Sequence, residues 1–203
     1  MRHERHHATG RRTIGRAAVA GMALVWGGVA IAAERVVIVL DPPTVETNLF
    51  WHGIGEKMPS HQSLVGHDPI TGAYDASELA AEWSADAGFT EWTFRLHPDA
   101  VFHGGWGPVT AHDVVHSYAL HTGPDSTIVA LQHLRAQAVE AIDDRTVVFR
   151  FDKPRTDYAF QHAGRGAMVI YSKKQHEAEG IAGYQIRPAG TAPYRFVERR
   201  VGE

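Results

Sequence analysis

The sequence predicts an α/β fold, and three local patterns support this. Residues 92–96 (WTFRL) alternate apolar and polar side chains, which is the two-residue period of a half-buried strand. A second alternating pattern over 139–151 is interrupted by polar residues at 143–145, which is typical of a β-hairpin. Thr110 is followed three residues later by Asp113, the capping-box spacing at the start of a helix. Strands and a capped helix within one chain indicate the α/β class.

Residues 1–33 are predicted to be a cleaved export signal. Five arginines lie within residues 1–16, an apolar run covers 17–32, and Ala30-Ile31-Ala32 is a small-residue cleavage pattern. The run is short for a membrane span, which needs about 20 residues. Arg11-Arg12 leaves twin-arginine export open beside ordinary secretion, and an uncleaved anchor is a third possibility. We therefore predict a periplasmic protein whose mature chain begins near Ala33.

The amino-acid composition indicates a globular protein and argues against some classes of partner. The sequence is 44% apolar and 21% charged, so it is not of the disordered class. It contains no cysteine, which excludes a disulfide framework, thiolate catalysis, a cysteine-based zinc site and a lipidated cysteine anchor. The net charge of −3 becomes more negative once the arginine-rich leader is removed. An acidic mature chain argues against a nucleic-acid partner, which would require a basic face.

A loop at residues 44–57 is the first candidate for ligand binding. It brings together Asn48, Phe50, Trp51 and His52, with glycines nearby. Aromatic and polar side chains on a loop are typical of a binding cleft. The alternative is that Phe50 and Trp51 only cover the edge of the core.

Further elements follow from local patterns. Residues 78–91 are expected to form a loop before the strand at 92–96, and His61 and His67 are expected to be exposed loop histidines. The helix that begins after Thr110 should run to about His121 and stop at Gly123. We also expect a buried strand at 35–40, a weak hairpin within 59–75, a second helical piece over 126–134, a helical or turn segment at 155–162, a buried strand at 167–171, a helix over 173–179 capped by Ser172, and a strand over 194–197.

Three segments together resemble a known family. The first, within 78–115, contains Leu79, Ala80, Trp83, Gly88, Thr93, Phe94, Leu96, Ala100, Phe102, His103, Gly105, Pro108, Val109, Thr110, Ala111, Asp113 and Val114. The second is the hairpin run up to Pro154, and the third is residues 188–196 (PAGTAPYRF). In this order they resemble the signature segments of the extracellular solute-binding proteins of family 5, the peptide and nickel receptors of ABC importers. Departures from the family pattern are His97, Gly104, Ala192 and one extra residue around Trp106-Gly107.

The resemblance implies a fold, a function and partners. It implies an incomplete periplasmic-binding-protein-like (type II) lobe with a mixed sheet, residues 34–203 being the amino-terminal lobe, truncated before the second lobe. The implied function is that of a monomeric extracytoplasmic receptor, which binds a peptide or similar small solute and delivers it to a membrane permease. Two alternatives stay open: a truncated remnant that binds nothing, and a receptor for a nickel or other metal chelate.

The predicted ligand-binding residues are Asn48, Trp51, His52 and Arg165. Arg165 follows a glycine in the loop before 167–171, where its guanidinium could pair bidentately with a ligand carboxylate. The alternative for Arg165 is a solvated loop charge.

No metal site, cofactor or catalytic activity is predicted. His112 and His116 are one helical turn apart, a spacing that can hold zinc or nickel. Because Val114, Val115 and Tyr118 should form the buried face, we expect both histidines to face solvent. The chain lacks a G-x-S-x-G elbow, a phosphate-binding P-loop, a dinucleotide motif and an H-E-x-x-H motif, so we do not expect an enzyme.

Overall fold

A computed structural model describes residues 47–52, 60–128, 135–163 and 168–198. The predicted export signal, the strand expected at 35–40 and Arg165 lie outside these residues. So does most of the helical piece expected at 126–134.

The main sheet has four antiparallel strands in the order β3-β4-β8-β7. Their bounds are Ala80–Ala85 for β3, Glu91–Leu96 for β4, Ala138–Ala141 for β7 and Thr146–Arg150 for β8. The alternation predicted for β4 is confirmed, because Trp92, Phe94 and Leu96 are buried. The β7–β8 hairpin is also confirmed, and the Asp143 carboxylate accepts hydrogen bonds from backbone N–H groups in its turn.

Strand β3 corrects the expectation of a loop before β4. It pairs with β4 along most of its length, with an irregularity between Ala80 and Glu82. No local pattern predicts this strand, since β3 is an edge strand with mostly exposed side chains and no apolar alternation. Every strand pairing within the described residues is antiparallel. The mixed sheet that was expected needs a parallel partner, and the candidate strand at 35–40 is outside the described part.

Two small hairpins flank the sheet. Strand β1 (Gly66–His67) pairs with β2 (Tyr74–Asp75), which confirms the weak hairpin, and β5 (Val101–Phe102) pairs with β6 (Gly107–Pro108). The short 3-10 helix η2 (His103–Gly105) joins β5 to β6. Three glycines in this connection, Gly104, Gly105 and Gly107, have φ of 75°, 81° and 99°, a backbone region that other residues rarely adopt. Glycine at these three positions therefore has a conformational reason.

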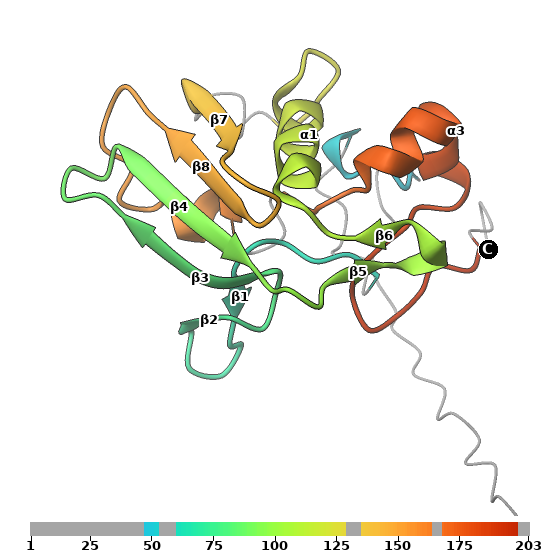
Figure 1. Ribbon diagram of the computed structural model, residues 1–203, viewed down its shortest axis with the longest axis horizontal. Coiled ribbons are helices and arrows are strands. Elements are labelled where there is room, and N and C mark those ends of the chain that lie inside the picture. The colour runs from blue at the N-terminus through green and yellow to red at the C-terminus, as the bar shows by residue number, and fades with distance from the viewer. Residues whose placement is uncertain (1–46, 53–59, 129–134, 164–167, 199–203) are drawn as a thin grey trace, which may run out of the picture. The chain divides into compact units, whose positions relative to one another are not determined.

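Helix α1 (Ala111–Thr122) lies between the sheet and helix α3 (Figure 1). It begins after the predicted cap and ends at Gly123, as expected. Val114 and Tyr118 are buried against the sheet as predicted, and Val115 is partly buried. His112 is exposed as expected, but His116 is partly buried. The buried face also includes Ser117 and His121, because α1 is covered by the sheet on one side and by α3 on another.

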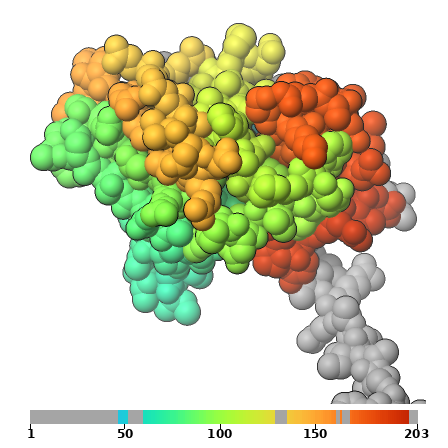
Figure 2. Space-filling view, viewed as in Figure 1, coloured from blue at the N-terminus to red at the C-terminus, as the bar shows by residue number. Residues whose placement is uncertain are grey.

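Helix α3 (Lys173–Ile186) continues well past the expected end at residue 179. The Ser172 hydroxyl accepts a hydrogen bond from Gln175 N at 3.2 Å, which confirms the predicted cap. At Gly180 the backbone has φ 65° and ψ −169°, so the helix breaks there and then resumes. Figure 2 shows α3, in orange-red, packed against the yellow-green surface around α1 and β6.

Two apolar clusters fill the interior, and one extended segment contributes to both. The larger lies between the sheet and α1, and the smaller gathers Leu49, Phe50, Trp51, Val169, Tyr171 and Tyr184. Within residues 168–171, Met168 and Ile170 enter the larger cluster, while Val169 and Tyr171 enter the smaller. The segment is buried as predicted but is not a strand. Its N–H groups bond instead to the Gln62 carbonyl and the Ser117 hydroxyl.

Of the two remaining predicted elements, one is present and one is not. A π-helix η3 (Ala159–Ala163) overlaps the helical or turn segment expected at 155–162. The strand expected at 194–197 is not formed, and Tyr194 and Val197 are 57% and 78% exposed. Aromatic and β-branched residues favour a strand, but a strand also requires a neighbour to complete its hydrogen bonds, and the described residues provide none there.

One buried carboxylate links the two long helices, and its removal is expected to destabilise the fold. Asp113 accepts hydrogen bonds from Thr110 N at 2.8 Å, from the Thr110 hydroxyl at 2.7 Å and from Lys173 N at 2.7 Å. It is only 5% exposed, so Asp113→Ala leaves these donors without a partner. We expect a loss of about 3 kcal/mol in the free energy of unfolding, measured by urea denaturation.

The matched control for this substitution is Asp143→Ala. Asp143 also accepts two backbone N–H groups, but it does so in an exposed turn where water can replace it. Asp143→Ala should lower the free energy of unfolding by about 1 kcal/mol. Equal losses for the two variants would contradict the linking role of Asp113.

Candidate functional site

The loop that the sequence singled out is fastened to the end of α3. The Asn48 side-chain amide donates to the Gln185 carbonyl at 2.7 Å, and the Gln185 side-chain oxygen accepts from the Thr47 hydroxyl at 2.8 Å. The Tyr171 hydroxyl donates to the Asn48 carbonyl at 2.5 Å and accepts from Phe50 N at 3.1 Å. These contacts join residues more than 120 positions apart, so the loop is held by the tertiary structure.

Trp51 lies at the centre of an aromatic group. The centroid of its ring is 5.1 Å from that of Tyr171 and 6.1 Å from those of Tyr184 and His121, and the rings meet edge to face. The Trp51 carbonyl accepts from Thr127 N at 2.7 Å. The residue is 3% exposed, so its position is fixed on all sides by neighbouring rings and backbone.

A hollow of about 540 Å³ lies beside this loop. It is lined by Trp51, the end of α1 with the residues that follow it (Ala119, Leu120 and 123–125), and Ile181 of α3. Its size falls within the range of small-molecule sites. Aromatic and aliphatic side chains form most of the wall, and Asp125 places an exposed carboxylate at its edge.

The predicted ligand-binding residues have different positions. Asn48 and Trp51 come together in the fastened loop, and Trp51 also lines the hollow. His52 ends the short 3-10 helix η1 (Phe50–His52), and its side chain is not among those described. Arg165 lies outside the described residues. Contact of any of the four with a ligand stays a prediction.

Two buried histidines beside this loop were missed or misjudged in the sequence. His61 was expected to be exposed but is 4% exposed, with its ring 5.1 Å from the rings of Phe50 and Tyr171. His121 is fully buried and its Nδ1 donates to the Ser117 carbonyl at 2.7 Å. The spacing of His121 from Val114, two turns along α1, could have predicted its burial. Nothing in the local sequence around His61 carries such a signal.

Burial changes the acid–base behaviour of both histidines. It lowers the pKa of His61 to about 3, with a smaller effect from His103 and His121 nearby, and lowers the pKa of His121 to about 4. The Nε2 atoms of both rings have no hydrogen-bond partner among the described residues. Both imidazoles are therefore neutral at neutral pH.

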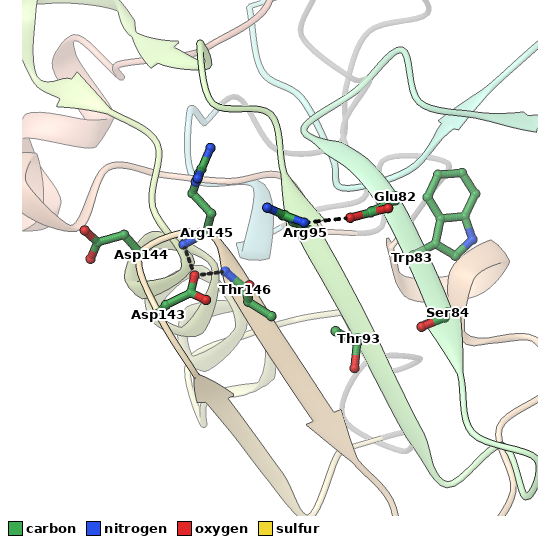
Figure 3. Close-up of a pocket in the computed structure, with 9 residues that line it drawn as sticks. All are labelled: Glu82, Trp83, Ser84, Thr93, Arg95, Asp143, Asp144, Arg145 and Thr146. Carbon is green, nitrogen blue, oxygen red and sulfur yellow. Dashed lines mark hydrogen bonds and ion pairs between the residues drawn. The ribbon is translucent and has the colours of Figure 1, made fainter.

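A second hollow, of about 710 Å³, lies on the outer face of the sheet (Figure 3). Its floor is formed by β3, β4 and the β7–β8 turn, and its lining residues are almost all polar or charged. Arg95 and Glu82, both more than half exposed, pair across it at 3.2 Å. This is the solvated face of a half-buried sheet, and it contains none of the predicted ligand-binding residues.

The described residues form neither a metal cluster nor a membrane-spanning helix. In that part of the chain, three or more histidine, aspartate or glutamate side chains do not gather in a way that could hold a metal ion. No helix there is both long and apolar enough to cross a bilayer.

Comparisons with known proteins were made by sequence and by structure. Residues 76–203, more than half of the chain, match the bacterial extracellular solute-binding proteins, family 5 (middle). The "Probable D,D-dipeptide-binding periplasmic protein DdpA" of Escherichia coli (strain K12) is 30% identical over 172 residues, which cover 81% of this chain and 32% of DdpA. The chain thus spans about a third of the length of this relative.

Solved structures of similar proteins agree with this family match. MoaA from A. tumefacien R10, in complex with mannopinic acid, has a TM-score of 0.61 and 28% identity over 68% of this chain and 28% of its own. Haemophilus influenzae OppA, in complex with the peptide RPPGFSPFR, has a TM-score of 0.62 and 25% identity over 71% of this chain and 31% of its own. Nickel-binding NikZ from Campylobacter jejuni, at 22% identity and a TM-score of 0.60, shows the fold alone. The type II periplasmic-binding-protein-like fold is confirmed, and the chain belongs to the extracellular solute-binding proteins of family 5, receptors of ABC transporters.

Proposed function

We propose that this protein is the extracytoplasmic solute-binding component of an ABC transporter, which binds a peptide or a similar small solute and delivers it to a membrane permease. The family consists of periplasmic or extracellular receptors rather than enzymes. The 30% identity with a relative named for dipeptide binding favours a peptide-like solute. In this proposal, the described residues form one wall of the ligand site.

The observation that carries the proposal is the hollow beside Trp51. Leu120 and Ile181 can contact an apolar ligand side chain, with only the small exposed part of Trp51 behind them. The Asp125 carboxylate at the edge can pair with a ligand amino group. The loop that places Trp51 is tied to α3 and to Tyr171 by hydrogen bonds, so the wall is formed before a ligand arrives. A preformed wall loses little ordering entropy on binding.

A substitution at the hollow gives the sharpest test. Ile181 is 39% exposed and lines the hollow, so Ile181→Trp should fill it without disturbing the core. We expect the full chain to bind a dipeptide saturably in isothermal titration calorimetry, with D,D and L,L forms compared. The substitution should weaken that binding about tenfold or more, a change of about 1.4 kcal/mol.

The matched control is Ile186→Trp on the same helix. Ile186 is 74% exposed and does not line the hollow, so this variant should bind as the parent does. Equal weakening by both variants would place the site elsewhere. Absence of saturable binding by any peptide would overturn the proposal in favour of a non-binding remnant, and binding of a nickel chelate alone would favour the metal-chelate alternative.

A further inference from the structure

Two histidines from distant parts of the chain face each other between α1 and α3. His116 Nε2 lies 3.0 Å from His176 Nδ1, and the two ring centroids are 4.9 Å apart. The Tyr184 hydroxyl lies 3.3 Å from His116 Nε2, but its proton is directed to the Ser172 carbonyl, to which it donates at 2.5 Å. The two imidazole nitrogens are therefore close together with, at most, one proton between them.

This separation equals that of two neighbouring ligands on one metal ion. Imidazole nitrogen binds zinc at about 2.0–2.1 Å, so two such nitrogens are about 3.0 Å apart at a 90° angle and about 3.4 Å apart at a tetrahedral angle. Nickel and copper also accept imidazole, often with 90° angles. The distance between His116 Nε2 and His176 Nδ1 therefore suits two ligands of one such ion.

Charged side chains lie beside the pair. Glu177 follows His176 in α3, and its carboxylate pairs with the Lys173 ammonium. A cation bound by the histidines would attract this carboxylate.

We propose that His116 and His176 form a binding site for a divalent transition metal ion of the zinc, nickel or copper type, which bridges α1 and α3. The site offers two protein nitrogens, with water filling the remaining positions, because no third histidine, aspartate or glutamate among the described residues completes a cluster. It stands independently of the proposed solute site. It also differs from the His112–His116 pair, since His112 is exposed one turn away on α1.

The test is thermal unfolding of the full chain, followed by circular dichroism, in EDTA and then with ZnCl₂ or NiCl₂. An ion that binds only the folded protein stabilises it by mass action. At roughly 100 times the dissociation constant we expect the melting temperature to rise by about 5–10 °C, and to return when EDTA is added. His176→Gln and His116→Gln, which keep a polar side chain at the contact, should each abolish most of that rise.

His112→Gln is the matched control, because it removes an exposed histidine from the same helix and should leave the rise unchanged. The leader histidines His3, His6 and His7 are present in every variant, so they cancel in the comparison. Melting in EDTA shows whether each variant is folded. The proposal is overturned if the metal ion does not raise the melting temperature of the parent chain. It is also overturned if His176→Gln and His116→Gln show the same rise as the parent chain.

Discussion

Two buried histidines are expected to lower the free energy of unfolding by about 4 kcal/mol when the pH is lowered from 7 to 5. The cause is the burial of His61 and His121 beside the Asn48–His52 loop. In the folded chain the pKa of His61 is about 3 and that of His121 is about 4, against 6.5 for each in the unfolded chain. Both side chains are at least 95% buried, so solvent does little to reduce the effect.

The direction follows from which state binds protons. Below pH 6.5 the unfolded chain protonates both histidines, while the folded chain keeps them neutral until the pH approaches 4 or 3. Each histidine therefore removes about 1.4 kcal/mol of stability per pH unit within that window. Above pH 6.5 both states hold neutral imidazoles, and the two groups contribute no further dependence.

Urea denaturation at a series of pH values between 5 and 8 measures this slope. His61→Phe places an apolar ring against Phe50 and Tyr171 and removes one titrating group. It should therefore reduce the slope below pH 6 by about 1.4 kcal/mol per pH unit. His112→Gln is the control, because it removes an exposed histidine. A stability that does not change between pH 7 and 5, or a His61→Phe variant with the parent slope, would contradict this explanation.

The Gly190→Ala substitution is expected to destabilise the fold by more than about 4 kcal/mol. A Cβ atom at this position would lie 1.7 Å from the Ser60 carbonyl oxygen and 2.6 Å from its carbon. Both are backbone atoms, and that same oxygen accepts a hydrogen bond from Ala192 N at 3.1 Å. The Gly190 carbonyl in turn accepts from His103 N at 2.8 Å. Relief of the clash would therefore break contacts that join three segments.

Gly88→Ala provides the matched comparison in urea denaturation. A Cβ atom there would approach the exposed Asp86 carboxylate at 3.2 Å, a contact that a shift of a few tenths of an ångström relieves. We expect a change of about 0.5 kcal/mol or less. If the two variants lost similar amounts of unfolding free energy, the close backbone contact at Gly190 would not be the reason for a glycine at this position. The glycine in the 188–196 segment, first noted as part of a family pattern, thus has a steric explanation.

Several elements could be predicted from sequence because their causes are local. The alternation in β4, the Asp143 turn and the Thr110–Asp113 cap each depend on residues within a few positions of one another. The same applies to the Ser172 cap of α3. The sequence also pointed to the aromatic loop at 47–52, because aromatic side chains on a loop are unusual without a covering or binding role.

Other features were decided by contacts between distant segments. Strand β3 exists because β4 offers it hydrogen bonds, and the extended segment 168–171 divides its side chains between two clusters without joining a sheet. The burial of His61 and the hollow beside Trp51 depend on how α1, α3 and the loop pack together. The His116–His176 contact joins residues 60 positions apart. Local hydrogen bonds and side-chain periodicity thus specified several elements of this protein, and its ordered motifs pointed to the family. Packing across the chain, which no short window of sequence contains, shaped the candidate site.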